Sequence, residues 1–490
     1  MVVLHTDAVV KHNVAGASGL NSCYIMDSDK AYPRPVPFKD ALRQIGARSL
    51  RYPYGRLGDN YLWNWPYTDI SAGLRPRVAS MNASPGNMSW CVRASGTDKG
   101  YYYNDLGFDD FIAICKELNI EPLIMVCALA YKTDDGYTDT FVTLDDLANS
   151  AAAWVKYANI TKGYGVKYWQ IGNECDQHTA NAAEYVTIYQ TIARKMKAVD
   201  PAIKIGTGIN GKSSYNKQVL DNSFAEGLVN FISVHQYTYP TVTNPDKNPD
   251  WLLGGYPGWS AHVGDYYPSV KDMQDMIDAN PQYKSVEIMV TETNPKGEVY
   301  PEGTVINANS TLYTNDIYKS LIFFEMNMTQ LACANVRYTY FWCTHSPWWG
   351  DPTKSATPDG GLDVVLDRNN NPTAMGKLIG LVNANLLPGL LKVTPQTVGM
   401  LRFYATVSDD GKTVTLFALN KDNTTYNNFT FGVSGNTQYK LTSKTFFFGS
   451  SPQDEQPTVA GAALADTSKV WSMPLPGCSL SLFRMEKKSQ

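Results

Sequence analysis

Two glutamates stand where strand-like segments end, and their chemistry could converge on one bond. Glu174 closes the segment IGNE (171–174), and Glu292 lies in the segment TETN (291–294), 118 residues later. Hydrolysis of a glycosidic bond needs two carboxyl groups, one to protonate the leaving oxygen and one to act at the anomeric carbon. A single glutamate at a strand end is more often solvated or salt-bridged, so the pair needs support from its neighbours.

Five further side chains close strand-like segments and could supply that support. The amide of Asn173 could bind a sugar hydroxyl, and the hydroxyl of Tyr237 could hydrogen-bond a nucleophilic carboxylate. The charge of Arg51 would keep a nearby carboxylate ionised by lowering its pKa. His235 closes the same segment as Tyr237, and Trp342 offers an apolar face for a sugar ring. So many suitable side chains at strand ends would be an improbable coincidence for purely structural residues. We therefore expect these strand ends to meet at one site.

The segments that carry these residues are short, apolar runs between about residues 14 and 388. A first strand at 14–21 has a weak, glycine-rich pattern. Seven clearer strand candidates follow it, at 49–53, 121–128, 166–173, around 204–208, 231–237, 285–293 and 337–342.

Helical patterns separate these strand candidates, and the alternation predicts the fold. Continuous apolar strands between helices indicate a parallel sheet covered by helices. Eight such units fit a (β/α)₈ barrel, in which the active site lies at the strand ends. An open, doubly wound sheet is the alternative, but no Gly-x-Gly-x-x-Gly turn follows an early strand to support a dinucleotide-binding version. The clearest helical patterns lie at 37–47, 107–119, 144–160, 182–200 and 309–327.

The sequence pattern changes after residue 388. Alternating or aromatic strands such as GMLRFYATVS and KTVTLFALN are separated by polar turns, which is typical of an all-β sandwich. We therefore predict an α/β chain of two domains: a catalytic barrel over residues 1–388 and a C-terminal β-sandwich over 389–490.

Composition excludes several classes of partner. The 490 residues include 42 Lys plus Arg and 46 Asp plus Glu, a net charge of −4, which argues against nucleic acid as the main partner. The sequence contains no run of about 18 apolar residues, so we predict no membrane span. Aromatic residues make up 12% of the chain, which suits either uncharged, ring-shaped ligands or simply a large core.

The spacing of the cysteines and histidines does not match a metal-binding motif. The eight cysteines show no CxxC pair, although a bridge between Cys333 and Cys343 stays open. The six histidines show neither HxH nor HExxH spacing, so we expect no metal and no cofactor. The N-terminus lacks a basic stretch followed by an apolar core. We favour a secreted protein recorded in its mature form, with a cytoplasmic one as the alternative.

Six segments together resemble a known group of enzymes. They are RYPYGRLGDNYLWNWP (51–66), GLRPR (73–77), GFDDFIAICKELNIEPLIMV (107–126), YGVKYWQIGNE (164–174), ISVHQY (232–237) and VTETN (290–294). The sequence resembles the clan A glycoside hydrolases, in which the acid/base follows strand four and the nucleophile follows strand seven. Within that clan it is most similar to glycoside hydrolase family 51, which contains arabinofuranosidases and endoglucanases, and the resemblance covers nearly the whole barrel.

This resemblance implies a retaining double displacement. Glu174 would be the general acid/base and Glu292 the nucleophile, with carboxyl groups about 5–5.5 Å apart. Arg51 and Tyr237 would keep Glu292 ionised, and Asn173 would bind the 2-hydroxyl of the sugar. The negative charge of the free nucleophile is expected to raise the pKa of Glu174. His235 also matches a family position, where it could orient the rim.

Departures from the family pattern bear on the substrate. The arabinofuranosidases carry Pro-Gly-Gly where this chain has Pro53-Tyr54-Gly55, so Tyr54 is expected to reshape the floor of a furanose pocket. Trp348 and Trp349 lie just after the last barrel strand, where they could stack on sugars. Ordinary loop packing is the competing explanation for each tryptophan. The aromatic-rich loops are NYLWNWPY (60–67), WLLGGYPGWS (251–260) and THSPWWGD (344–351).

These loops favour an endo-β-1,4-glucanase that acts on plant cell-wall polysaccharide, with glucan first and xylan next. The first alternative is an α-L-arabinofuranosidase that releases arabinose from arabinan or arabinoxylan. The second is an inactive carbohydrate-binding protein, because a fold does not guarantee an activity. The oligomeric state stays open.

Overall fold

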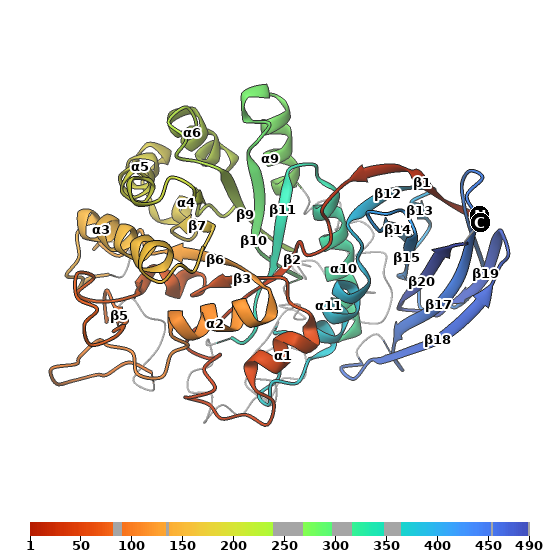
Figure 1. Cartoon of the computed structure of the whole chain (residues 1–490), viewed down its shortest axis with the longest axis horizontal. Coiled ribbons are helices and arrows are strands. Elements are labelled where there is room, and N and C mark those ends of the chain that lie inside the picture. The colour runs from red at the N-terminus through yellow and green to blue at the C-terminus, as the bar shows by residue number, and fades with distance from the viewer. Residues whose placement is uncertain are drawn as a thin grey trace, which may run out of the picture.

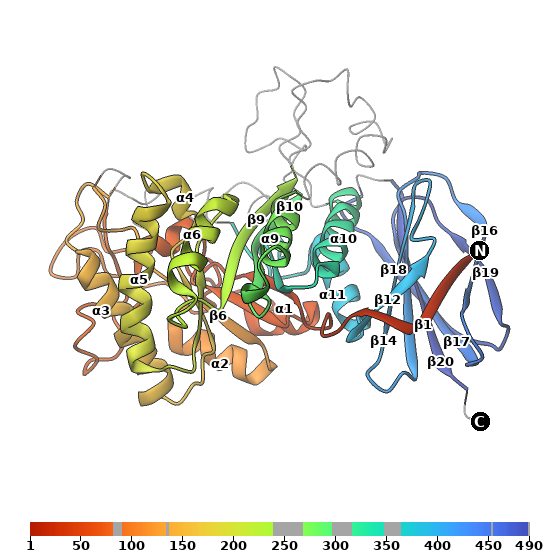
Figure 2. The same cartoon turned by 90° about the horizontal axis from the view of Figure 1, so that it is seen from above.

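The structure is a computed structural model that describes residues 1–81, 91–133, 137–238, 268–295, 316–346, 364–451 and 454–488. A closed barrel wrapped by helices forms one side of the molecule, and a large curled sheet forms the other (Figure 1). Two helices, α10 (Ile317–Ala332) and α11 (Ala374–Asn385), lie between them (Figures 1 and 2).

Eight parallel strands close the barrel, each beside the next in chain order, with the last pairing with the first. All eight predicted strands are confirmed, including the weak first one, of which only residues 18–21 form the strand. The predicted (β/α)₈ fold is therefore correct. The strands are β2 (Ser18–Asn21), β3 (Ser49–Tyr52), β6 (Glu121–Val126), β7 (Tyr168–Ile171), β8 (Lys204–Thr207), β9 (Phe231–Thr238), β10 (Glu287–Pro295) and β11 (Val336–Phe341).

The helices outside the barrel include the five predicted ones. The helix predicted from residue 309 begins at Ile317, where Asp316 caps it, and residues 309–315 lie outside the described chain. Over the described residues the structure adds four α-helices that we did not single out. The predicted helices are α1 (Phe38–Ile45), α2 (Phe108–Leu118), α3 (Leu144–Val155), α5 (Ala182–Val199) and α10, and the added ones are α4 (Cys175–His178), α6 (Ser213–Ser223), α9 (Pro268–Asp278) and α11.

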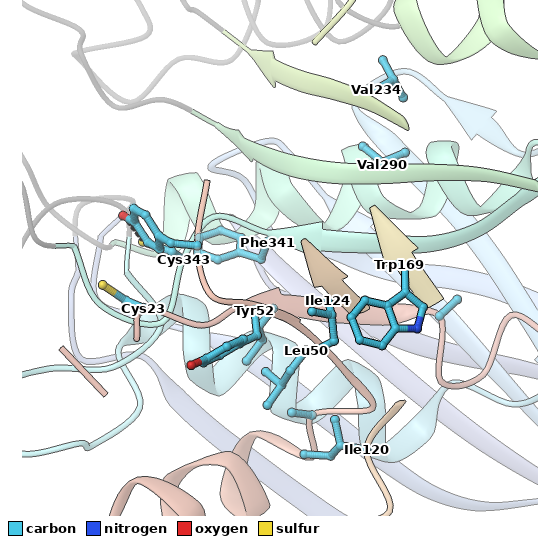
Figure 3. Packing of buried hydrophobic residues seen from close by; sticks show 14 of the residues in the cluster. Cys23, Leu50, Tyr52, Ile120, Ile124, Trp169, Val234, Val290, Phe341 and Cys343 are labelled. Carbon is cyan, nitrogen blue, oxygen red and sulfur yellow. Dashed lines mark hydrogen bonds between the residues drawn. The ribbon is translucent and has the colours of Figure 1, made fainter. Parts of the chain in front are cut away.

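Alternation along each strand separates two sets of buried residues. Leu50, Ile124 and Trp169 come from neighbouring strands and belong to the main core cluster (Figure 3). Their strand neighbours Leu123 and Tyr168 belong to a separate cluster of residues from the barrel strands. Because side chains alternate between the faces of a strand, one set packs against the helices and the other fills the barrel. Arg51 follows Leu50, so this alternation directs it into the barrel.

The second sheet is mostly antiparallel, as predicted for the C-terminal β unit. Its order is β18-β17-β20-β15-β14-β12-β1-β16-β19, with β13 paired to β14. Its later strands are β12 (Gly389–Thr394), β13 (Thr397–Val398), β14 (Leu401–Val407), β15 (Thr413–Asn420), β16 (Tyr426–Val433), β17 (Tyr439–Phe448), β18 (Thr458–Asp466), β19 (Val470–Leu475) and β20 (Ser479–Lys487).

The first strand of the chain also lies in this sheet. Strand β1 (Val2–Lys11) pairs antiparallel with β12 and parallel with β16, and both chain ends lie at this sheet (Figure 2). The predicted division at residue 388 stays a prediction about domains. The division assigns residues 2–11 to the barrel, whereas β1 pairs with strands of the second sheet. Pairing between segments so far apart in the sequence leaves no local signal.

A buried cluster of charges joins the sheet to helix α10. Glu325 on α10 accepts hydrogen bonds from Nε of Arg402 at 2.9 Å and from Nζ of Lys421 at 2.8 Å. The side chain of Lys421 is fully buried, and burial lowers its pKa to about 8. The ring of Phe324 packs beside this cluster, 5.7 Å from the ring of Tyr404. These contacts fix the sheet against the barrel.

None of the described helices combines the length and the apolar character that crossing a membrane would require.

We expect the substitution Glu325→Gln to lower the free energy of unfolding by about 3–5 kcal/mol, because it leaves the ammonium of Lys421 buried without its counter-charge. Urea unfolding followed by tryptophan fluorescence measures the change. The matched control is Glu226→Gln, which breaks an exposed pair with Arg194 and should cost at most about 1 kcal/mol. Equal, small effects of both substitutions would contradict the role of this cluster.

Candidate active site

Strand register brings the two predicted carboxylates to one end of the barrel. Strands β9 and β10 pair so that Glu292 is opposite His235, and Asn294 is opposite Tyr237. Glu174 follows strand β7, two strands away from β9 in the closed barrel. The C-terminal ends of parallel barrel strands meet at the same rim, so these side chains converge there.

Glu292 is buried and receives a hydrogen bond on each carboxylate oxygen. Nη1 of Arg51 donates to Oε1 at 2.9 Å, and the hydroxyl of Tyr237 donates to Oε2 at 2.5 Å. Burial and the neighbouring charge of Glu292 raise the pKa of Tyr237 well above its usual value, so the phenol remains a donor. Two such donors stabilise the ionised form of a carboxylate and fix its orientation.

Arg51 organises the whole floor of the site. Its side chain is fully buried, and a buried charge is tolerated only with partners for its donors. Besides Glu292, Nη1 reaches Oδ1 of Asn21 at 2.8 Å and Nε reaches Oε1 of Gln170 at 2.9 Å. Nη2 donates to Oδ1 of Asn173 at 2.7 Å. The predicted side chains Arg51, Asn173 and Glu292 are therefore in one hydrogen-bonded group.

His235 lies between the two carboxylates. Its Nδ1 is 3.0 Å from Oε1 of Glu174 and 3.4 Å from Oε2 of Glu292. One oxygen of each carboxylate and one nitrogen of His235 lie within 4.8 Å of one another. A pair that is this close matches the separation of retaining glycosidases and is too close for the intervening water of the inverting ones.

The pKa of Glu174 differs from the sequence-based expectation. Burial tends to raise it, but the hydrogen bond with His235 and the electrostatic effects of His235, Arg51 and His178 together outweigh burial, so the pKa lies below its usual value. We expected the charge of Glu292 to raise it. The prediction is wrong because it did not include the basic side chains that surround the pair.

Glu174 has an unusual backbone conformation. Its φ of 49° and ψ of 35° are left-handed, a region that costs a non-glycine residue about 1–2 kcal/mol. Gly172, two residues earlier, also has a positive φ, of 75°. Between them, the backbone N–H of Asn173 donates to Oδ2 of Asp59 at 2.9 Å. Surrounding contacts must hold such a turn in place.

Trp342 and Tyr54 pack against each other. The Tyr54 ring is fully buried, with its centroid 4.3 Å from that of Trp342. Tyr54 therefore packs against Trp342, and its expected effect on the floor of a sugar pocket stays a prediction. At Gly55, an added Cβ would lie 2.6 Å from Cη2 of Trp342 and 2.7 Å from Oε1 of Glu292. Only glycine lets the chain pass this close to both side chains.

The predicted aromatic loops have mixed outcomes. Trp63 is buried and stacks on Trp154, with centroids 5.7 Å apart and planes 7° apart. It is therefore a core residue, and its expected role in sugar stacking is wrong. Trp65 in the same loop is only partly buried. Trp348 and Trp349 lie outside the described residues, as does the loop at 251–260.

The same acidic and histidine side chains define what could hold a metal. Among the described residues, Glu174, His235 and Glu292 form the group with ligand atoms close enough for one ion. Both oxygens of Glu292 already accept hydrogen bonds, one of them from the Arg51 guanidinium. An ion there would sit beside the guanidinium of Arg51, so the arrangement favours acid–base chemistry. Cys333 and Cys343, whose pairing was left open, form no disulfide.

Three residues of the site were not predicted from the sequence. Asn21 and Gln170 bind Arg51, and Asp59 binds the turn before Glu174. Asn21 closes the first barrel strand, so the rule about strand ends would have found it had the pattern of that strand been clearer. Asp59 lies in a loop, and its role depends on contacts between distant segments.

Sequence comparison links this chain to arabinofuranosidases. A family model described as "Alpha-L-arabinofuranosidase 1 domain" matches residues 41–250. Alpha-L-arabinofuranosidase C of Emericella nidulans is 27% identical over 42% of this chain and 42% of its own length. An intracellular exo-alpha-(1->5)-L-arabinofuranosidase of Acetivibrio thermocellus is 27% identical over 40% of this chain and 38% of its own length. The chain thus spans about two fifths of the length of these relatives.

Structure comparison agrees over a longer stretch. The thermostable GH51 alpha-L-arabinofuranosidase of Thermotoga petrophila has a TM-score of 0.69 and 17% identity, with 99% of each chain covered. At that identity the likeness shows a shared fold, a barrel with a C-terminal β domain. The chain is thus similar to family 51 glycoside hydrolases in sequence over 41–250 and in fold over nearly its whole length.

We expect Gly55→Ala to lower the free energy of unfolding by about 1–3 kcal/mol, because the methyl group overlaps Trp342 and Glu292. Thermal unfolding measures this change. The control is Gly211→Ala, whose added Cβ would meet nothing within 4 Å. A Gly55→Ala protein as stable as that control would show that the close approach is not a constraint.

Proposed function

We propose that this protein is a retaining α-L-arabinofuranosidase. The observation that carries the proposal is the pair of carboxylates with oxygens within 4.8 Å, of which Glu292 is held by Arg51 and Tyr237. In this proposal, Glu292 is the nucleophile and Glu174 the general acid/base. The sequence similarity to arabinofuranosidases supports the choice of sugar.

In the first step, a carboxylate oxygen of Glu292 attacks the anomeric carbon. The bond from that carbon to the leaving oxygen breaks, and Glu174 gives its proton to that oxygen. In the second step, Glu174 takes a proton from water, whose oxygen attacks the same carbon and releases Glu292. Two inversions restore the original configuration.

The first step needs Glu174 protonated, although its pKa lies below the usual value. The side chain is 21% exposed. A bound sugar would cover it and remove its remaining water, which raises the pKa of a carboxyl group. Glycosylation then removes the charge of Glu292, which favours loss of the proton from Glu174 for the second step. The protonation state of Glu174 would thus change as the sugar binds and then becomes attached to Glu292.

The sugar would be held by the group around Arg51. Among the described residues, none accepts a hydrogen bond from Nδ2 of Asn173, whose Oδ1 is fixed by Arg51. This Nδ2 could donate to the 2-hydroxyl, as the family resemblance implies. Trp342 would flank the ring.

The preference for an endo-β-1,4-glucanase is not supported. It rested on aromatic loops, of which Trp63 proves to be a core residue and Trp348 and Trp349 lie outside the described chain. The relatives that match in sequence are named as arabinofuranosidases. We therefore favour release of arabinose from arabinan or arabinoxylan. Secretion stays a prediction, as do a polysaccharide partner and the absence of nucleic-acid and membrane partners.

We expect Glu292→Ala to lower kcat for para-nitrophenyl α-L-arabinofuranoside by about 10⁴-fold or more, because no nucleophile remains. Glu174→Ala should lower kcat by about 10²–10⁴-fold. Added azide should restore the rate of this variant and give an arabinofuranosyl azide of retained configuration. Product NMR measures both outcomes. A Glu292→Ala protein of wild-type rate would overturn the proposal and favour an inactive or different site.

We expect the wild-type protein to release arabinose, and no mixed oligosaccharides, from a panel of arabinan, xylan, mannan and β-glucan. Product sizes distinguish the two candidate activities, since mixed oligosaccharides from glucan would restore the glucanase interpretation. The same assay after treatment with EDTA should give an unchanged rate, because the mechanism needs no metal. Complete loss with EDTA would count against the two-glutamate mechanism.

A further inference from the structure

We propose that the carboxylate of Asp59 is a positioning residue for catalysis, because it holds the turn that presents Asn173 and Glu174. The proposal rests on the proposed function, in which Glu174 is the acid/base. Asp59 does not contact the reacting atoms. It acts through the backbone on which the acid/base stands.

Asp59 joins the ends of three barrel strands. It lies in a short 3₁₀ helix, Arg56–Asn60, which follows strand β3, and it is only 2% exposed. Its Oδ1 accepts the backbone N–H of Ala128, just after β6, at 3.0 Å. Its Oδ2 accepts the backbone N–H of Asn173, just after β7, at 2.9 Å. One carboxylate thus fixes the spacing between these strand ends.

The turn that Asp59 holds is one that would otherwise relax. Gly172 and Glu174 both have positive φ, and Asn173 lies between them. The side chain of Asn173 is bonded to Arg51, whereas its backbone is bonded to Asp59. Asn173 is therefore held from both sides, and Glu174 follows it directly. If the Asp59 contact is lost, the Glu174 carboxyl is free to move relative to Glu292.

Ionised Asp59 fits this position better than neutral Asp59. A carboxylate accepts at both oxygens, which matches the two N–H groups that it faces. A protonated carboxyl turns one oxygen into a donor that opposes an N–H group. One of the two contacts is then weakened, and a buried N–H without a full acceptor is costly.

The charged and titratable groups around Asp59 come from several elements. The positive charges of Arg56 and Arg51 favour its ionised form, as do the two backbone N–H groups. The thiols of Cys127 and Cys175 and the phenol of Tyr185 also interact with it. Burial outweighs the favourable contacts and raises the pKa of Asp59 to about 7. Protonation of Asp59, and with it the loosening of the turn, therefore occurs as the pH falls below neutrality.

The effect of this group on stability has the opposite sign to its effect on activity. A carboxyl whose pKa is raised by folding stabilises the native state most below its unfolded pKa, and this contribution is lost as the pH rises through the folded value. Protonation of Asp59 thus favours the folded state while it weakens catalysis. A loss of activity on the acid side of pH 7 should leave the protein folded.

The test compares the pH dependence of kcat in wild type, Asp59→Asn and Asp105→Asn. The control residue, Asp105, is another acid with a raised pKa, of about 6, and it bonds to Tyr61 away from the Glu174 turn. Each profile uses the glycoside that wild type cleaves fastest. Circular dichroism at each pH confirms that the proteins are folded.

We expect the acid limb of the wild-type profile to have an apparent pKa near 7. In Asp59→Asn we expect kcat to fall by about 10- to 100-fold, because a displacement near 1 Å has such effects, with KM changed less than about twofold. The acid limb of this variant should move to lower pH, since nothing at position 59 titrates. Asp105→Asn should retain the wild-type acid limb.

Two results would overturn the role of Asp59 alone: an Asp59→Asn variant with the wild-type kcat and acid limb, or a wild-type acid limb that lies below pH 5. The second result is available even if Asp59→Asn fails to fold. A wild-type protein that cleaves no glycoside would overturn the proposed function and the role of Asp59 together, so the two failures are distinguishable.

Discussion

The site depends on one buried cation. A guanidinium removed from water is stable only when its donors find acceptors, and Arg51 satisfies this requirement with Glu292, Asn21, Gln170 and Asn173. The acceptors come from the ends of three strands, β2, β7 and β10. The need to satisfy one charge therefore fixes the relative positions of side chains that are distant in sequence. Side chains of the protein alone hold the nucleophile we propose, which is the preorganisation that catalysis requires.

The two carboxylates are placed in different surroundings, and this difference suits their proposed roles. Glu292 is almost completely buried, with a donor on each oxygen, so its orientation is fixed. Glu174 is more exposed and stands on a turn that Asp59 supports through the backbone. A nucleophile benefits from rigidity and constant charge, whereas an acid/base must change its protonation state during each cycle.

The sequence predicts those features that follow from strand periodicity. Eight apolar strands between helices define the barrel, and the barrel brings Arg51, Glu292 and Tyr237 to one rim because each lies in the C-terminal part of a strand. The glutamates are recognisable for the same reason. These expectations need only local patterns and one rule of topology.

Other features depend on contacts that no local pattern encodes. The pKa of Glu174 falls because His235 and Arg51 approach it in three dimensions. Trp63 has the composition of a sugar-stacking residue but packs on Trp154. Asp59 is one loop residue among many until the ends of β6 and β7 are seen beside it, and β1 reveals its sheet only through pairing with β12.

The most direct test of the account is to trap the covalent intermediate. The protein is mixed with an activated 2-fluoro α-arabinofuranoside, which slows the second step, and is then analysed by intact mass and peptide mapping. The account predicts one added sugar per chain, attached to Glu292 and absent in Glu292→Ala. A sugar attached to another residue, or no adduct on a protein that hydrolyses the parent substrate, would contradict it.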